Sequence, residues 1–126
     1  MNGKRLANRI VKECLSMGAE DLCVIDVRKK TPFFDFIVVA TVDNAVLADA
    51  ILRRLDRSIE LDPGAVTRME SAAESTWFVL DFGDLFFHLF VGEEIRKRYD
   101  LEALWSETPR LHSEESAAAM DLPEQE

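Results

Sequence analysis

The sequence is poor in the residues that metal-binding, disulfide-stabilised and membrane-spanning proteins require. Its 126 residues include two cysteines, Cys14 and Cys23, and two histidines. The cysteines lie among apolar neighbours without the spacing of a metal or redox motif, so we expect buried, reduced thiols. No stretch approaches the ~20 consecutive apolar residues of a membrane-spanning helix. We therefore predict a protein without a metal, a cofactor or a membrane span.

Positive charge is scarce as well. The chain has 15 Lys and Arg residues against 24 Asp and Glu residues, which gives a net charge of −9. Its dense basic clusters lie in residues 4–12 and 96–98, whereas tight binding to a phosphate backbone depends on many clustered basic side chains. We expect no direct binding to DNA, and the charge favours a basic protein as partner. Residues 96–98, Arg-Lys-Arg, are interpreted as a solvated helix face.

The two ends of the chain differ in composition from its middle. Residues 1–20 mix basic and apolar residues and lack the continuous apolar stretch of a signal peptide, so we expect a cytoplasmic protein. The length predicts a single domain, which we place at residues 1–111. Residues 112–126 are rich in Glu, Ser and Ala, and we predict that they form an acidic, disordered tail.

The hydrophobic pattern predicts a mixture of helices and strands. Apolar residues recur at helical spacing in residues 4–17 and 44–58, and a third helix is expected to begin near residue 93. Short apolar runs predict strands at residues 22–27, 34–41 and 65–70, the second central and the third at an edge. With the hairpin described next, the fold class is α/β (α+β): a five-stranded mixed sheet flanked by helices.

Residues 75–91, STWFVLDFGDLFFHLFV, predict a β-hairpin, because two apolar runs flank a turn that contains Gly83. If Phe82 and Gly83 form the loop, pairs of residues lie opposite each other as follows: Trp77 and His88, Val79 and Phe86, Asp81 and Asp84. Side chains alternate along a strand, so the hairpin has two different faces. One face is wholly apolar and is predicted to be core; it consists of Phe78, Leu80, Leu85, Phe87, Leu89 and Val91.

The other face of the hairpin is mixed, and function is expected there. It carries Trp77, Val79, Asp81, Asp84, Phe86, His88 and Phe90. Two interpretations stay open for this face. It is either a second core face that a helix covers, or a protein-binding surface, since aromatic residues dominate the binding energy of interfaces.

The hairpin also contains residues that catalytic sites use, but their context favours a turn. Asp81-Phe82-Gly83 spells a kinase tripeptide, yet the chain has no glycine-rich loop and no kinase catalytic-loop motif. Gly83 is better explained by a positive φ in the turn. Asp81, Asp84 and His88 offer metal or acid–base groups, but turn aspartates usually accept backbone N–H bonds, and His88 lies roughly 10 Å or more from the tip. We predict no catalytic residue here.

Four stretches, in this order and at these spacings, resemble the ribosomal silencing factor family, also called the RsfS or Iojap family. They are Ile25-Asp26-Val27, residues 35–41 (DFIVVAT), residues 77–90 (WFVLDFGDLFFHLF) and residues 98–105 (RYDLEALW). The resemblance covers residues 4–111. It implies a protein that is not an enzyme but a translational repressor, which binds the large ribosomal subunit through ribosomal protein L-fourteen and blocks subunit joining.

The resemblance also implies a site and an architecture. The partner-binding residues carried over from the family are Trp77 and His88, together with Phe82, Asp84 and Tyr99. The implied fold is related in topology to nucleotidyltransferases, and free members of the family form homodimers. Two alternatives stay open: a nucleotidyltransferase-like enzyme that uses Asp81 and Asp84 with Mg²⁺, and a homodimeric scaffold without a ribosomal role.

Overall fold

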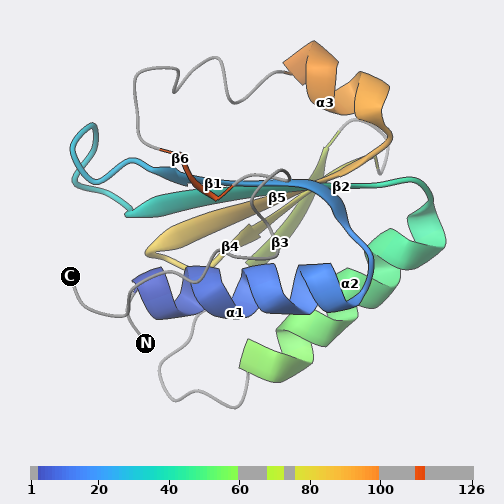
Figure 1. The fold of residues 1–126 in the computed structure, drawn as a ribbon, viewed down its shortest axis with the longest axis horizontal. Helices are drawn as coiled ribbons and strands as arrows, with labels where there is room; N and C mark the ends of the chain where they lie inside the picture. The colour runs from blue at the N-terminus through green and yellow to red at the C-terminus, as the bar shows by residue number, and fades with distance from the viewer. Residues whose placement is uncertain (1–2, 60–67, 73–75, 100–109, 113–126) are drawn as a thin grey trace.

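The computed structural model describes residues 3–59, 68–72, 76–99 and 110–112, which form three helices and a six-stranded sheet (Figure 1). The helices are α1 (Gly3–Ser16), α2 (Ala45–Ile59) and α3 (Glu93–Tyr99). The strands are β1 (Glu20–Asp26), β2 (Phe36–Val42), β3 (Arg68–Ala72), β4 (Trp77–Asp81), β5 (Leu85–Val91) and β6 (Arg110–His112).

The strands follow the order β3-β4-β5-β2-β1-β6, with β2 and β5 parallel and the other neighbouring pairs antiparallel. The predicted mixed sheet with flanking helices is therefore confirmed, and β3 lies at an edge as predicted. The predicted count of five strands is wrong, because residues 110–112 add β6 beside β1. Three residues, Arg-Leu-His, are too short for an alternating pattern, so only the pairing with β1 defines this strand.

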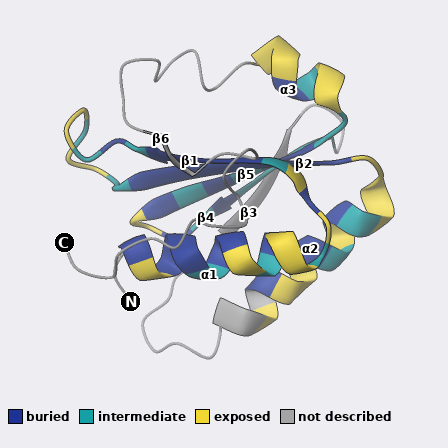
Figure 2. Cartoon of the chain, viewed as in Figure 1, coloured by how far each residue is buried: buried dark blue, intermediate teal, exposed yellow. Residues whose placement is uncertain are grey.

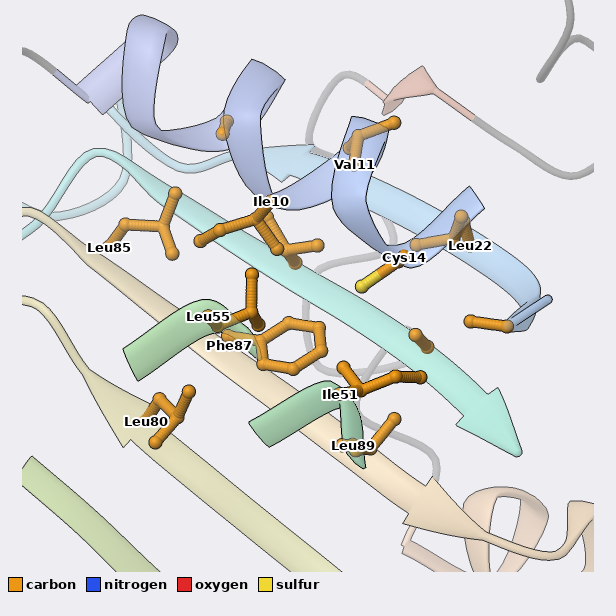
Figure 3. Close-up of a cluster of buried hydrophobic side chains, with 14 of the residues drawn as sticks. Ile10, Val11, Cys14, Leu22, Ile51, Leu55, Leu80, Leu85, Phe87 and Leu89 are labelled. Atoms are coloured by element: carbon orange, nitrogen blue, oxygen red, sulfur yellow. The ribbon is translucent and has the colours of Figure 1, made fainter. Parts of the chain in front are cut away.

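The helices cover the two faces of the sheet unequally (Figures 1 and 2). α1 and α2 lie together over the larger apolar core, while α3 lies on the opposite face, beside a smaller apolar cluster. All seven residues of β2 are buried, as expected for a central strand. Figure 3 shows the larger core, in which Ile10 of α1, Leu55 of α2 and Phe87 of β5 pack in one cluster. Both cysteines are buried as predicted, and burial raises the pKa of the Cys14 thiol.

The predicted faces of the hairpin are confirmed, but the predicted pairing of its strands is wrong by two residues. All six residues of the predicted core face belong to the larger core or pack against it. Trp77 lies opposite Phe90 rather than His88, and Val79 lies opposite His88 rather than Phe86. The predicted and observed loops both contain two residues, so the alternation of side chains keeps each residue on its predicted face.

The pairing shifts because the loop consists of Gly83 and Asp84 rather than Phe82 and Gly83. Asp81 lies opposite Phe86 instead of Asp84. Gly83 has the predicted positive φ, +88°, at the first loop position, which suits a two-residue hairpin turn. The side chain of Phe82 is 6% exposed. Burial of this ring holds Phe82 directly after β4, where its N–H donates to the Leu85 main-chain oxygen at 3.0 Å, rather than in the exposed loop.

Part of the prediction falls outside the described residues. This holds for residues 100–105 of the last family-like stretch, and for residues 113–126 of the predicted tail. Within the described part of the chain, none of the helices has the length and apolar character needed to cross a lipid bilayer.

Candidate protein-binding surface

The first residue of β4, Trp77, is the centre of an aromatic cluster on the face of the sheet that carries α3. Its ring stacks on Phe90, the residue opposite in β5, with 5.3 Å between ring centroids and 23° between ring planes. Tyr99, the last residue of α3, also contacts Trp77, with 4.6 Å between ring centroids. His88 is the fourth member, 5.8 Å from Trp77 between centroids. We call these four residues the aromatic cluster.

Trp77 and His88 are joined by a hydrogen bond as well as by ring contact. The indole Nε1–H donates to His88 Nδ1 at 3.0 Å. His88 lies two residues from Phe90 on β5, so it is the diagonal neighbour of Trp77, a position within reach of large aromatic side chains. A ring nitrogen accepts a hydrogen bond only when it carries no proton, so His88 is neutral and its proton is on Nε2. This bond fixes the orientation of both rings.

Burial lowers the pKa of His88 from its ordinary 6.5 to about 4. The charged imidazolium is disfavoured away from water, and a proton on Nδ1 would also remove the acceptor for the Trp77 N–H. His88 is therefore neutral at physiological pH, and the cluster keeps one arrangement across the neutral range.

Acid is expected to destabilise the fold through His88. The unfolded chain takes up a proton at this residue near pH 6.5, whereas the folded chain does so only near pH 4. The stabilisation is therefore complete above pH 6.5, falls as the pH drops from 6.5 to 4, and amounts to on the order of 3 kcal/mol. Urea unfolding at pH 7, 5.5 and 4.5 measures it, and His88→Gln should flatten this part of the profile. An NMR titration that gave His88 a pKa near 6.5 would contradict the prediction.

The aromatic cluster is only partly covered, which combines the two interpretations of the mixed face. Phe90 is fully buried and belongs to the smaller apolar cluster, against which Trp77 and Ile95 of α3 pack. Trp77 and His88 are intermediate in exposure, and Tyr99 is 40% exposed. Phe90 thus belongs to the core, whereas Trp77, His88 and Tyr99 are partly accessible to solvent. Half-buried aromatic side chains that pack on core residues are typical of interface anchors.

The aromatic character continues along β5 towards the hairpin tip. The ring of Phe86 makes an edge contact with Phe34, at 4.8 Å between centroids and 87° between planes. Phe86 and His88 are two residues apart on β5, so they lie on the same face. Phe34 lies in the connection between β1 and β2. The sequence analysis did not include it in the site, because no local pattern indicates that this segment lies beside β5.

The structure brings together three of the five predicted site residues and separates two. His88 and Tyr99 each contact Trp77. Phe82 lies in the larger core, on the side of the sheet that carries α1 and α2. Asp84 is exposed in the hairpin loop, where its main-chain oxygen accepts a bond from the Asp35 N–H at 2.7 Å. Phe82 and Asp84 are therefore not part of the aromatic cluster.

Two of the three groups considered for catalysis, Asp81 and His88, accept structural hydrogen bonds. Asp81 Oδ1 accepts the Gly83 N–H at 2.9 Å, and His88 Nδ1 accepts the indole N–H. Among the side chains that the structure describes, no group of three His, Cys, Asp or Glu residues is placed to hold a metal ion. The arrangement here suits packing against another molecule.

Arg96 is a correction to the sequence analysis. Its triplet was interpreted as solvated, and Lys97 and Arg98 are indeed exposed, but Arg96 is 8% exposed. Its guanidinium donates to Thr41 Oγ1 at 2.9 Å and to the main-chain oxygen of Asp21. The sequence position of Arg96, next to Ile95 and about one helical turn before Tyr99, could have indicated that its side chain faces the sheet.

Comparisons with known proteins bear on the family and the fold of this chain. The profile of the RsfS family, described as "Ribosomal silencing factor during starvation", matches residues 2–126. Ribosomal silencing factors of Treponema pallidum and Bacillus subtilis are 32% and 28% identical over 108 and 109 residues, which span 85% and 86% of this chain and 96% and 92% of those proteins. A crystal structure of a Chromobacterium violaceum protein has a TM-score of 0.75 at 23% identity, covers 84% of this chain and 88% of its own, and shows the same fold.

Proposed function

Because this chain belongs to the ribosomal silencing factor (RsfS) family, we propose that it binds the large ribosomal subunit and represses translation by blocking subunit joining. In this proposal the partner on the subunit is ribosomal protein L-fourteen, and the protein acts in the cytoplasm as a regulator rather than an enzyme. Blocking would be steric: a body of 126 residues bound on the joining face leaves no room for the small subunit.

The aromatic cluster is the observation that supports this proposal most directly. Trp77 offers a large, partly exposed ring that Phe90, His88 and Tyr99 already hold in one orientation. Because the ring is fixed before binding, less conformational entropy is lost when the partner packs against it. The net charge of −9 would speed encounter with a basic ribosomal protein.

The five predicted residues take different parts in this proposal. Trp77, His88 and Tyr99 would form the contact, while Phe82 would act only through the core on which the hairpin rests. Asp84 would reach a partner from the exposed hairpin loop. The same surface could also pair two copies of the free protein, which keeps the proposed homodimer compatible with the proposed ribosomal role.

The proposal is tested by following the association of purified ribosomal subunits by light scattering. Adding the protein to large subunits before small subunits are mixed in is expected to lower the final scattering signal in proportion to occupancy. In the matched control, the same amount of protein is mixed with the small subunits first, and large subunits are added last. The initial rate of association is measured before the protein has equilibrated with the large subunits, and we expect it to be reduced less than in the first experiment. Unchanged association at saturating protein would overturn the proposal and favour a homodimeric scaffold.

The enzymatic alternative requires a different surface, the hairpin turn with Asp81 and Asp84, and it assumes the nucleotidyltransferase-like topology that the family resemblance implies. The engagement of Asp81 with the Gly83 N–H weighs against a metal ligand at that position. Calorimetry with nucleotide and Mg²⁺ separates the two functions. Binding that disappears in Asp84→Asn would favour the enzyme.

A further inference from the structure

Arg96 is a buried cation on a helix whose other charged residues are exposed. α3 has seven residues, and Glu93, Glu94, Lys97 and Arg98 all lie in solvent. Burying a guanidinium away from water is costly unless its N–H groups find acceptors. Arg96 finds them on two different strands: Thr41 Oγ1 on β2, at 2.9 Å, and the main-chain oxygen of Asp21 on β1. One side chain thereby ties α3 to two strands of the sheet.

The strand β1 is shaped to receive this arginine. Its register with β2 shifts between Glu20 and Cys23, which marks a bulge, and Asp21 has a φ of +51°. A bulge takes a residue out of the regular ladder of main-chain hydrogen bonds. The Asp21 carbonyl is therefore available to Arg96, and Thr41, the partner of Glu20 in the ladder, lies at the same place. The irregular backbone of β1 thus supplies a hydrogen-bond acceptor for the buried guanidinium, and the guanidinium supplies a donor for the Asp21 main-chain oxygen.

The orientation of α3 decides where Tyr99 lies. Residues three and four positions apart share one side of a helix, so Ile95, Arg96 and Tyr99 all belong to the side that meets the sheet. Ile95 packs on the smaller apolar cluster, and Tyr99 contacts Trp77 at 4.6 Å. Apolar packing alone leaves a short helix free to slide and rotate, whereas hydrogen bonds from one guanidinium to fixed acceptors are directional.

We propose that Arg96 is a positioning residue for the aromatic cluster: it holds α3 so that Tyr99 closes on Trp77 in the arrangement that a partner recognises. This inference rests on the proposed ribosomal function. It assigns no contact with the partner to Arg96 itself, because the side chain is buried. If removing the hydrogen bonds leaves about a tenth of the molecules in the competent arrangement, the apparent Kd for the partner rises about tenfold.

The test compares Arg96→Met with Arg98→Met. Both remove one positive charge from α3, but only the first removes a buried donor. In the free protein, the indole N–H resonance of Trp77, assigned by its absence in Trp77→Phe, reports the place of the Tyr99 ring. We expect Arg96→Met to shift this resonance and to raise the Kd for large subunits about tenfold. Arg98→Met should change neither, and Arg96→Lys should restore part of both.

Each result decides something different. If Arg96→Met shifts the resonance but binds subunits as tightly as the wild type, or leaves the resonance unchanged, the positioning role is overturned. If the wild-type protein itself fails to bind large subunits, the proposed function is overturned, while the resonance still tells whether Arg96 places Tyr99. Should Arg96→Met fail to fold, Thr41→Val removes one acceptor with little change of shape, and it must then produce the same two effects at smaller amplitude.

Discussion

Replacing Trp77 by alanine is expected to weaken binding to the large ribosomal subunit about 30-fold or more, which corresponds to ~2 kcal/mol or more. The side chain is partly exposed, so a partner can reach it, yet Phe90 and Tyr99 hold it in place. The loss combines contact area with the fixed arrangement of the cluster, because neither His88 nor Tyr99 keeps its ring partner. Co-sedimentation with large subunits over a concentration series measures the change.

Two further variants show whether the loss is specific to this surface. Leu15→Ala also shortens an exposed apolar side chain, but on α1, against the other face of the sheet, and should bind as the wild type does. Trp77→Phe keeps an aromatic ring without the N–H donor and should fall between the wild type and Trp77→Ala. A folded Trp77→Ala protein that co-sediments normally would show that the aromatic cluster is not the contact surface.

Replacing Phe87 by alanine is expected to lower the free energy of unfolding by about 3–5 kcal/mol. Phe87 is fully buried in β5, within the larger core and beside Ile51 and Leu55 of α2 (Figure 3). Removing its ring leaves a cavity between the sheet and α2 that rigid neighbouring strands cannot fill. A domain of this size has a total stability of roughly 5–15 kcal/mol, so the variant should be close to unfolding at 37 °C. Urea denaturation followed by circular dichroism measures the difference.

Phe33→Ala is the matched control for this experiment. Phe33 is 82% exposed in the connection between β1 and β2, so the same chemical change should alter stability by no more than about 0.5 kcal/mol. If both variants lost equal stability, burial in the larger core would not explain the effect at Phe87. The Phe33 variant should also leave the His88 pH dependence unchanged, because its side chain lies in solvent.

The hairpin shows which parts of a fold are encoded locally. Leu80 and Phe87 were assigned correctly to the core and Trp77 and His88 to the other face, because alternation along a strand requires no knowledge of the partner strand. The pairing of Trp77 was wrong, since it depends on which two residues form the loop. The burial of Phe82 decided that, and burial is a property of the whole core.

Three of the five proposed site residues lie together, but the sequence did not indicate how they are arranged, and it also named Phe82 and Asp84, which lie outside the aromatic cluster. The family resemblance named Trp77, His88 and Tyr99, but nothing local indicates that a residue at the end of α3 contacts the first residue of β4. Phe34 and Arg96 were missed for the same reason. Phe34 reaches Phe86 from another segment of the chain, and Arg96 finds its acceptors 55 and 75 residues away. β6 exists only through its pairing with β1.

By itself, therefore, the sequence determined the helices and the five longer strands, the two faces of the hairpin, the positive φ of Gly83 and the family. These depend on residue type, on periodicity and on short motifs, all of which act over a few neighbouring residues. The tertiary structure decided the hairpin pairing, the sixth strand, the burial of Phe82 and Arg96, and the meeting of Tyr99 with Trp77. Each of these depends on contacts between segments far apart in the chain, whose free energy is set by burial and hydrogen bonding in the assembled core rather than by local preference.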